Sequence, residues 1–248
     1  MGEEATAMQD TAASGAGIRD AIGPLIGRNR IAADFYDGPG WPRFRRWEQG
    51  FLMFGGGVRR ARMEIVRHVL DIRKTNAMGL EVGIGDGENL ALLPRGWEVH
   101  GVDVARTRLE VCLARYPSIS GRLAWAEGEA LPYEDATFDA CWSIGGFNYF
   151  RDHEAALREM QRVTRRGGPL VVADEVPGLH RAGIGHLFGL PWIDAYWLRA
   201  LGLDRAFVEM VLSFDVDLDG LIARVWPGAS RYRIWRGMGY CWVSRNEF

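Results

Sequence analysis

The sequence has little cysteine, no long hydrophobic run and no excess of positive charge. Its cysteines, Cys112, Cys141 and Cys241, are widely spaced and form no Cys-x-x-Cys pattern, which argues against a disulfide framework and against a metal site. No apolar run reaches the length of about eighteen residues that a membrane-spanning helix needs. A net charge of −2 argues against a nucleic-acid-binding protein, which would normally carry a basic excess.

The N-terminus also lacks a secretory signal. Its first residues, MGEEATAMQDTAASGAG, are acidic and rich in Ala, Gly and Ser, without a basic segment followed by an apolar one. We therefore expect a cytoplasmic protein whose residues 1–20 form a disordered tail. An N-terminal helical segment is expected over residues 21–74, and a core domain over residues 75–248 with a cap insert at about 177–225.

From residue 75 onward, short apolar segments alternate with helical ones. Five of the apolar segments are strand candidates: residues 78–82, 97–102, 123–126, 138–144 and 170–173. The clearest helices between them are residues 107–116 and 152–165, and Asp152 is a natural N-cap for the second. Residues 231–236 and 240–244 are typical of a hairpin.

Apolar strands that alternate with helices indicate a parallel sheet with both faces covered. The expected fold is α/β: a Rossmann-like, doubly wound, mostly parallel seven-stranded sheet that ends in an antiparallel C-terminal hairpin. N-terminal helices from about Pro42 and over residues 58–73 precede the sheet, and the cap insert is expected to be helical.

The stretch GLEVGIGDGEN runs from an apolar strand into Gly83, Gly85 and Gly87. In an open α/β sheet, such a loop lies where ligands bind, beyond the carboxyl ends of the strands. A nicotinamide or flavin fingerprint would need a further glycine where Glu88 stands.

The same stretch carries three carboxylates, on Glu81, Asp86 and Glu88. These groups would repel a pyrophosphate, but they suit a ligand that carries positive charge. S-adenosylmethionine is such a ligand, because it has an ammonium group and a sulfonium and no phosphate.

Four segments in this order resemble class I S-adenosylmethionine-dependent methyltransferases, and most closely the branch of small-molecule enzymes that contains the ubiquinone and menaquinone methyltransferases. The segments are GLEVGIGDGEN, VHGVDVA, AEGEALPYEDATFDACWSIGGFNYF and EMQRVTRRGGPLVVADEV. The resemblance covers residues 75–176, and it departs from the family pattern where Arg166 replaces a usual proline. It implies that residues 75–248 are a methyltransferase domain and that S-adenosylmethionine is the cofactor.

The resemblance also implies which residues hold the cofactor. Asp103, followed by Val104, would accept the ribose hydroxyls, and Glu127 or its neighbour Glu129 would lie at the adenine amino group. The full set of expected cofactor-binding residues is Glu81, Gly83, Gly85, Gly87, Asp103, Val104, Glu127, Gly128, Glu129 and Ser143. Ordinary structural roles stay open for several of them: Asp103 could cap the next helix, and Glu127 could simply face solvent.

Candidates for a catalytic base are few. Tyr149 and His153 both follow the fourth strand, and Glu175 ends the fifth strand on the cofactor side. His180 and His186 lie in the cap insert and are alternatives. A base of this kind would help methylation of a hydroxyl group, whereas a thiolate or an amine needs none.

Two aromatic segments outside the shared core are expected to form the acceptor site. They are WPRFRRWEQGFLMF and GIGHLFGLPWIDAYWLRALGLDRAFVEMVL. They favour a small-molecule acceptor that is at least partly apolar. Peripheral membrane contact is an alternative interpretation of these segments. We favour a cap subdomain whose core contains the aromatic side chains and whose arginines face solvent.

The expected function is transfer of a methyl group from S-adenosylmethionine to this acceptor. A non-catalytic S-adenosylmethionine-binding module stays open as an alternative. A nicotinamide-dependent oxidoreductase is opposed by the loop spacing and the surplus acids. The methylated atom, the acceptor and the oligomeric state do not follow from the sequence.

Overall fold

The computed structural model describes residues 17–53, 57–72, 74–176, 188 and 190–247. His180, His186 and most of the expected disordered tail lie outside the described residues.

Among the described residues, a mostly parallel sheet of eight strands forms the centre of the fold, in the order β1-β4-β3-β2-β5-β6-β8-β7. The strands are β1 (Ile18–Asp20), β2 (Met78–Val82), β3 (Glu98–Asp103), β4 (Leu123–Trp125), β5 (Ala140–Ile144), β6 (Pro169–Glu175), β7 (Ser230–Ile234) and β8 (Gly239–Arg245). Neighbouring strands are parallel from β1 to β6, whereas β8 is antiparallel to both β6 and β7. The expected α/β fold with an antiparallel C-terminal hairpin is therefore confirmed.

The strand count differs from the expected seven because β1 comes from the end of the segment expected to be a disordered tail. Ile18 pairs in register with Leu123, and Asp20 with Trp125, along the outer edge of β4. Within β1 only Ile18 is buried, so three residues with one apolar contact give no periodic signal in the sequence. Pairing with β4 covers a strand edge that would otherwise be open.

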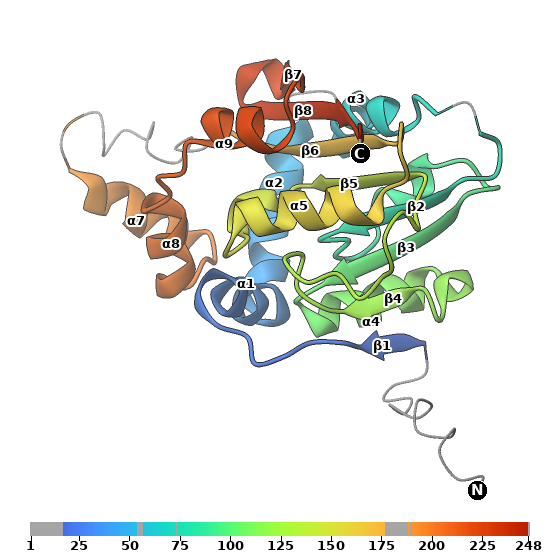
Figure 1. Cartoon of the computed structure of the whole chain (residues 1–248). Coiled ribbons are helices and arrows are strands. Elements are labelled where there is room, and N and C mark those ends of the chain that lie inside the picture. The colour runs from blue at the N-terminus through green and yellow to red at the C-terminus, as the bar shows by residue number, and fades with distance from the viewer. Residues whose placement is uncertain (1–16, 54–56, 73, 177–187, 189, 248) are drawn as a thin grey trace, which may run out of the picture.

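Helices cover both faces of the sheet and extend beyond its carboxyl end (Figure 1). They are α1 (Gly27–Asp37), α2 (Gly40–Met53), α3 (Val58–Val69), α4 (Arg106–Arg115), α5 (His153–Val163), α7 (Pro191–Ala200), α8 (Arg205–Leu212) and α9 (Leu218–Val225). Short 3-10 turns lie at Leu90–Leu92, Pro117–Ile119, Phe147–Tyr149 and Trp235–Gly237.

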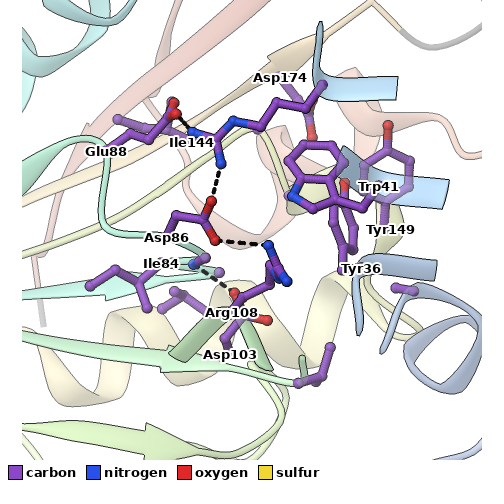
Figure 2. Close-up of a pocket in the computed structure, with 18 of the residues that line it drawn as sticks. Tyr36, Trp41, Ile84, Asp86, Glu88, Asp103, Arg108, Ile144, Tyr149 and Asp174 are labelled. Atoms are coloured by element: carbon purple, nitrogen blue, oxygen red, sulfur yellow. Dashed lines mark hydrogen bonds and ion pairs between the residues drawn. The ribbon is translucent and has the colours of Figure 1, made fainter. Parts of the chain in front are cut away.

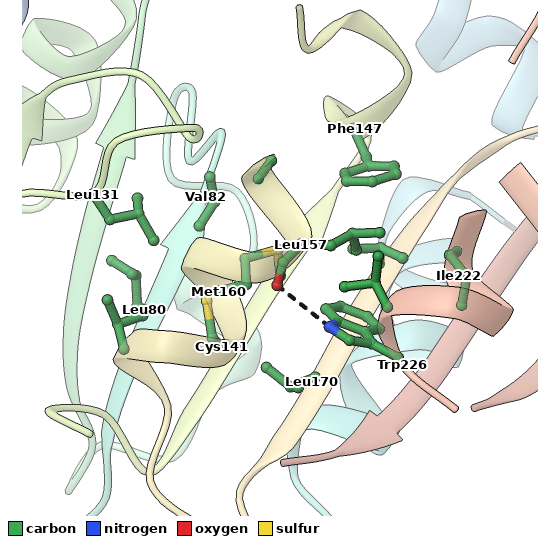
Figure 3. Packing of buried hydrophobic residues seen from close by; sticks show 14 of the residues in the cluster. Leu80, Val82, Leu131, Cys141, Phe147, Leu157, Met160, Leu170, Ile222 and Trp226 are labelled. Carbon is green, nitrogen blue, oxygen red and sulfur yellow. Dashed lines mark hydrogen bonds between the residues drawn. The ribbon is translucent and has the colours of Figure 1, made fainter. Parts of the chain in front are cut away.

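The α5 and α9 helices pack on one face of the sheet. Leu157 and Met160 of α5 meet Ile222 of α9 and the fully buried Trp226 that follows it (Figure 3). The indole Nε1 of Trp226 donates a hydrogen bond of 3.3 Å to the carbonyl oxygen of Leu157. This bond satisfies a polar group that would be costly to bury alone.

The opposite face is covered by α3 and α4. Ile65, Val66 and Val69 of α3 lie against Trp142 of β5, while Leu109 of α4 packs with the residues near β4. Because the two faces are covered by helices from different parts of the chain, the sheet is doubly wound, as expected.

The expected cap insert contains three helices among its described residues, and they separate into two groups. The α9 helix packs on the sheet, whereas α7 and α8 pack against α1 in a separate apolar cluster. At its centre Phe35 of α1 stacks on Phe207 of α8, with ring centroids 3.9 Å apart. Figure 1 places this group beside the end of the sheet, next to α1 and α2.

No helix within the described residues is both long enough and apolar enough to cross a membrane.

Candidate functional site

A cavity of about 570 Å³ lies at the carboxyl ends of β2, β3, β5 and β6. The chain leaves β2 toward β3 on one side and later returns to β5 on the other, so β2 and β5 mark the point where the strand order reverses. Ligands of doubly wound folds bind at this point. Residues of α1 and α2 also line the cavity, as do Leu198 and Leu201 of the cap.

The glycine loop after β2 forms one wall of the cavity. Gly83 and Gly85 line it, with φ angles of +79° and +52° that favour glycine. A Cβ atom on Gly85 would have no protein atom within 4 Å, so the backbone there borders open space. Gly87 has a different role, because a Cβ atom on it would lie 2.6 Å from the Sγ of Cys112 in α4. Gly87 is therefore required for packing against α4, whereas Gly85 leaves the loop backbone open to the cavity.

Asp103 and Val104 line the cavity beside the glycine loop. The Asp103 carboxylate accepts a 2.8 Å hydrogen bond from the backbone N–H of Gly85 and another of 2.8 Å from that of Ala105. Burial raises the pKa of Asp103 to about 6. The carboxylate thus fixes the loop and still offers oxygen lone pairs to hydroxyl donors.

Glu81 is the most deeply buried carboxylate of the cavity wall, with 1% of its surface exposed. Its Oε1 accepts a hydrogen bond from the side-chain amide of Asn89, and the side chain of Trp142 and the charge of Arg62 also favour the carboxylate form. Burial raises the pKa of Glu81 to about 7. A buried carboxylate on the wall of a cavity is suited to a cationic group of a ligand.

The other two carboxylates of the loop already have cationic partners. Asp86 forms ion pairs with Arg45 of α2 and with Arg108 of α4, the second at 3.4 Å. Glu88 is paired with the same Arg45 and, at 2.7 Å, with Arg62 of α3. Figure 2 shows Asp86 between two such groups, with Arg108 labelled. The expectation that all three carboxylates suit a cationic ligand is therefore corrected, because Asp86 and Glu88 are paired with arginines and Glu81 alone remains for such a ligand.

Of residues 127–129, which were expected near an adenine ring, Gly128 lines the cavity and the two glutamates do not. Glu127 and Glu129 accept hydrogen bonds from the amide of the buried Asn29 in α1, at 2.7 and 3.0 Å. Glu129 also accepts a 2.8 Å hydrogen bond from the backbone N–H of Arg151. In this structure both glutamates hold α1 against the core.

Ser143 lies behind the cavity wall. It is fully buried, and its Oγ would be 3.9 Å from a Cβ atom on Gly83. Its hydroxyl has no hydrogen-bond partner among the described residues. It is not among the residues that line the cavity.

Tyr149 and Glu175 meet on the side of the cavity away from the glycine loop. The Tyr149 hydroxyl donates a 2.9 Å hydrogen bond to Oε1 of Glu175, and both residues line the cavity. Burial and the nearby Glu175 carboxylate raise the pKa of Tyr149 well above its usual value. The neighbouring Asp174 accepts hydrogen bonds from the backbone N–H groups of Asn148 and Glu175, which orients the end of β6.

His153 does not reach the cavity. Its ring packs edge-on against Phe147 and Phe214, at centroid distances of 5.2 and 5.5 Å. Burial, together with the nearby Arg28, lowers the pKa of His153 to about 4. The side chain is thus a buried neutral group of the core, and it is not placed to accept a proton from a ligand in the cavity.

An aromatic wall closes the side of the cavity that faces the cap. It is formed by Tyr36 of α1 and Trp41 and Phe44 of α2, together with Leu198 and Leu201. Figure 2 shows Tyr36, Trp41 and Tyr149 gathered on one side, across from Ile84 and Asp103. Both aromatic segments that the sequence analysis expected around the acceptor contribute to this wall.

Sequence reasoning missed the structural roles of Asn29, Arg45 and Arg108. Their partners lie far away in sequence: Arg45 and Asp86, for example, are separated by 41 positions. The only local signal was the alternation of arginines with aromatics in WPRFRRW.

Similar proteins point to one family. The model of a methyltransferase domain matches residues 80–172. The chain is 34% identical to the demethylmenaquinone methyltransferase of Thermus thermophilus over 73% of this chain and 74% of that protein. It is 40% identical to methyltransferase GfsG of Streptomyces halstedii, but this match spans only 39% of this chain and 37% of that protein.

Among solved structures, an S-adenosylmethionine-dependent methyltransferase of Thermotoga maritima superimposes with a TM-score of 0.54 over 89% of this chain and 100% of that chain. At 15% identity this likeness shows the fold alone.

Proposed function

Because the chain belongs to the class I S-adenosylmethionine-dependent methyltransferases, we propose that it methylates a small lipophilic molecule that carries an ionisable hydroxyl group. The observation that carries this proposal is one continuous cavity with two kinds of wall. A polar wall contains Glu81 and Asp103, and an apolar one contains Tyr36 and Trp41. The pair Tyr149–Glu175 also lines it.

The residues of the polar wall fit S-adenosylmethionine. The buried carboxylate of Glu81 on the cavity wall suits the ammonium group, and the lone pairs of Asp103 suit the ribose hydroxyls. The open space at Gly85 lets the ligand approach the backbone closely. When bound, this cofactor supplies a methyl group that its positively charged sulfur makes electrophilic.

The apolar wall supports a lipophilic acceptor. Indole, phenol and leucine side chains bury the surface of a hydrophobic ligand and exclude water from the cavity. The relative from Thermus thermophilus is named for demethylmenaquinone, and an aromatic acceptor of that general kind would suit these residues. The polar atoms at the end of this wall belong to Tyr149, Asp174 and Glu175.

The pair Tyr149–Glu175 supports the hydroxyl group of the proposed acceptor. With its pKa raised, Tyr149 stays protonated near neutral pH and acts as a hydrogen-bond donor. Glu175 then takes the proton from the hydroxyl group of the molecule to be methylated. The hydrogen bond from Tyr149 keeps the Glu175 carboxylate oriented. Removal of that proton raises the nucleophilicity of an oxygen, or of a ring carbon conjugated with it.

A methylation screen tests the proposal. The protein is incubated with S-adenosylmethionine and a panel of lipophilic phenols, quinols, thiols and amines, and S-adenosylhomocysteine and methylated product are measured by mass spectrometry. We expect turnover with the phenols or quinols. Turnover confined to thiols or amines would contradict the hydroxyl acceptor, and cofactor binding without turnover on any class would favour a non-catalytic module.

A further inference from the structure

The α7 helix presents an exposed aromatic surface next to the acceptor side of the cavity. Trp192, Tyr196 and Trp197 are 66%, 65% and 61% exposed. The rings of Tyr196 and Trp197 lie 5.9 Å apart edge-on, so they form one patch. Large side chains of this kind are normally buried, and a group of them on the surface indicates a binding face.

The same helix reaches the cavity with its other side. Leu198 is buried and lines the cavity, as does Leu201 just after the helix. On α2, Trp47 is 59% exposed and also lines the cavity, so the rim itself is aromatic. Figure 1 shows α7 at the outer edge of the molecule, away from the sheet. A lipophilic molecule held at the outer face of α7 would be close to the cavity.

The charges on α7 are arranged unequally. Its only carboxylate, Asp194, is buried, whereas Arg199 is exposed three positions after Tyr196 on the same face. At the end of the helix Arg43 of α2, also exposed, donates a 2.8 Å hydrogen bond to the carbonyl oxygen of Ala200. The exposed face of α7 therefore combines Trp and Tyr with positive charge and carries no carboxylate.

We propose that the exposed face of α7 docks on an anionic lipid bilayer, from which the lipophilic acceptor enters the cavity. Trp and Tyr are the side chains that concentrate at the membrane–water interface, and arginines near the surface are attracted to anionic headgroups. The proposal rests on the proposed function for its lipophilic acceptor, but the docking itself is measurable without any acceptor. The sequence favoured a cap whose core holds the aromatics and whose arginines face solvent, whereas the exposure of Trp192, Tyr196 and Trp197 supports docking.

Co-sedimentation with large unilamellar vesicles tests the docking. The full chain is mixed with vesicles of phosphatidylcholine alone or of equimolar phosphatidylcholine and phosphatidylglycerol. We expect binding to the mixed vesicles that weakens with salt, and weaker binding to phosphatidylcholine alone. Absence of binding to the mixed vesicles would overturn the proposal.

Three variants locate the contact. The double substitution Trp192→Ser with Tyr196→Ser should weaken vesicle binding by about tenfold or more, because it removes the interfacial aromatics. Arg199→Glu should weaken binding to the mixed vesicles by at least about fivefold, since each basic residue contributes roughly that factor. Tyr232→Ser, on β7 away from α7 in Figure 1, removes another exposed aromatic and should leave binding unchanged.

Two further measurements keep the outcomes separate. Titration of each variant with S-adenosylhomocysteine without vesicles should give the wild-type affinity, which shows that the cofactor site is intact. A variant that binds the cofactor normally but no longer binds vesicles shows that α7 makes the membrane contact. If the wild type itself does not bind S-adenosylhomocysteine, the proposed function is contradicted instead. Light scattering completes the test: a dimer that the double substitution converts to a monomer would assign this face to a second copy and overturn the proposal.

Discussion

Arg45 of α2 forms ion pairs with both Asp86 and Glu88, so one guanidinium group joins the helix that covers the cavity to the glycine loop beneath it. Because its side chain is only 17% exposed, solvent screens these pairs less than it would screen surface ones. The neighbouring Trp41 and Phe44 of α2 line the cavity. The position of the aromatic wall therefore depends on Arg45.

Replacing Arg45 with Met should loosen α2 over the cavity. We expect S-adenosylhomocysteine to dissociate about tenfold faster, which corresponds to a loss of roughly 1.4 kcal/mol in the free energy that holds α2 closed over the ligand. Stopped-flow displacement measures the rate. Arg46→Met, which changes an exposed arginine on the same helix, is the matched control and should leave it unchanged. Equal rates in the wild type and Arg45→Met would show that α2 does not retain the ligand.

Removing the charge of Glu81 should weaken cofactor binding but stabilise the ligand-free protein. In the unfolded chain its pKa is near 4.5, and in the folded protein burial raises it to about 7. Between these values the folded protein holds a proton that the unfolded chain has released, so the contribution of this site to stability falls as the pH rises from 4.5 to 7. Above pH 7 the full cost of a buried charge remains.

The variant Glu81→Gln removes this cost. At pH 8 the ligand-free variant should be more stable than the wild type by about 1–3 kcal/mol, and at pH 4.5 the difference should vanish. Its affinity for S-adenosylmethionine should fall at least about tenfold at pH 8, since a charged partner of the ammonium group is lost. Urea unfolding and calorimetry at both pH values measure the two effects. Unchanged affinity would remove Glu81 from the site.

Gly85 and Gly87 form a matched pair of substitutions. Gly85→Ala places a methyl group in the open space of the cavity, and it should abolish cofactor binding while it costs only about 1 kcal/mol of stability. Gly87→Ala drives a methyl group against the Sγ of Cys112, so it should cost more, about 2–3 kcal/mol. Thermal unfolding and calorimetry separate the two. Tight binding to Gly85→Ala would contradict the placement of the ligand beside this residue.

Glu175 and His153 differ in their expected effect on turnover. With a hydroxyl acceptor, Glu175→Gln should lower kcat by about 10²–10⁴-fold and leave S-adenosylhomocysteine binding unchanged, because only the proton acceptor is lost. His153→Gln should lower the Tm, since it disturbs the packing with Phe147 and Phe214, and it should leave kcat within about threefold of the wild type. A large loss of kcat in His153→Gln with Glu175→Gln fully active would exchange the two assignments.

The fold and the cofactor could be predicted from the sequence because their signals are local. Alternating apolar strands and helices define the sheet, and the segment from Glu81 to Gly87 lies within a few residues of its strand. The family confirms S-adenosylmethionine as the cofactor. The strand β1 gave no such signal, since its pairing with β4 is made by backbone groups across about a hundred residues.

Side-chain roles at the site were harder to predict, because partners distant in sequence decide them. Glu127 carries the right charge at an expected position, yet Asn29 of α1 occupies its carboxylate. Asp86 was counted among the carboxylates that suit a cationic ligand, but Arg45 and Arg108 are its ion-pair partners. His153 follows an N-cap in a position typical of a solvated residue, but α5 turns it into the aromatic core.

The cavity beside the glycine loop is the proposed binding site of S-adenosylmethionine. Calorimetric titration of the purified protein with S-adenosylhomocysteine, with NADH as the control ligand, tests it most directly. We predict one site of micromolar affinity for S-adenosylhomocysteine that Gly85→Ala abolishes, and no binding of NADH. Binding of NADH alone, or S-adenosylhomocysteine binding that survives Gly85→Ala unchanged, would contradict the account.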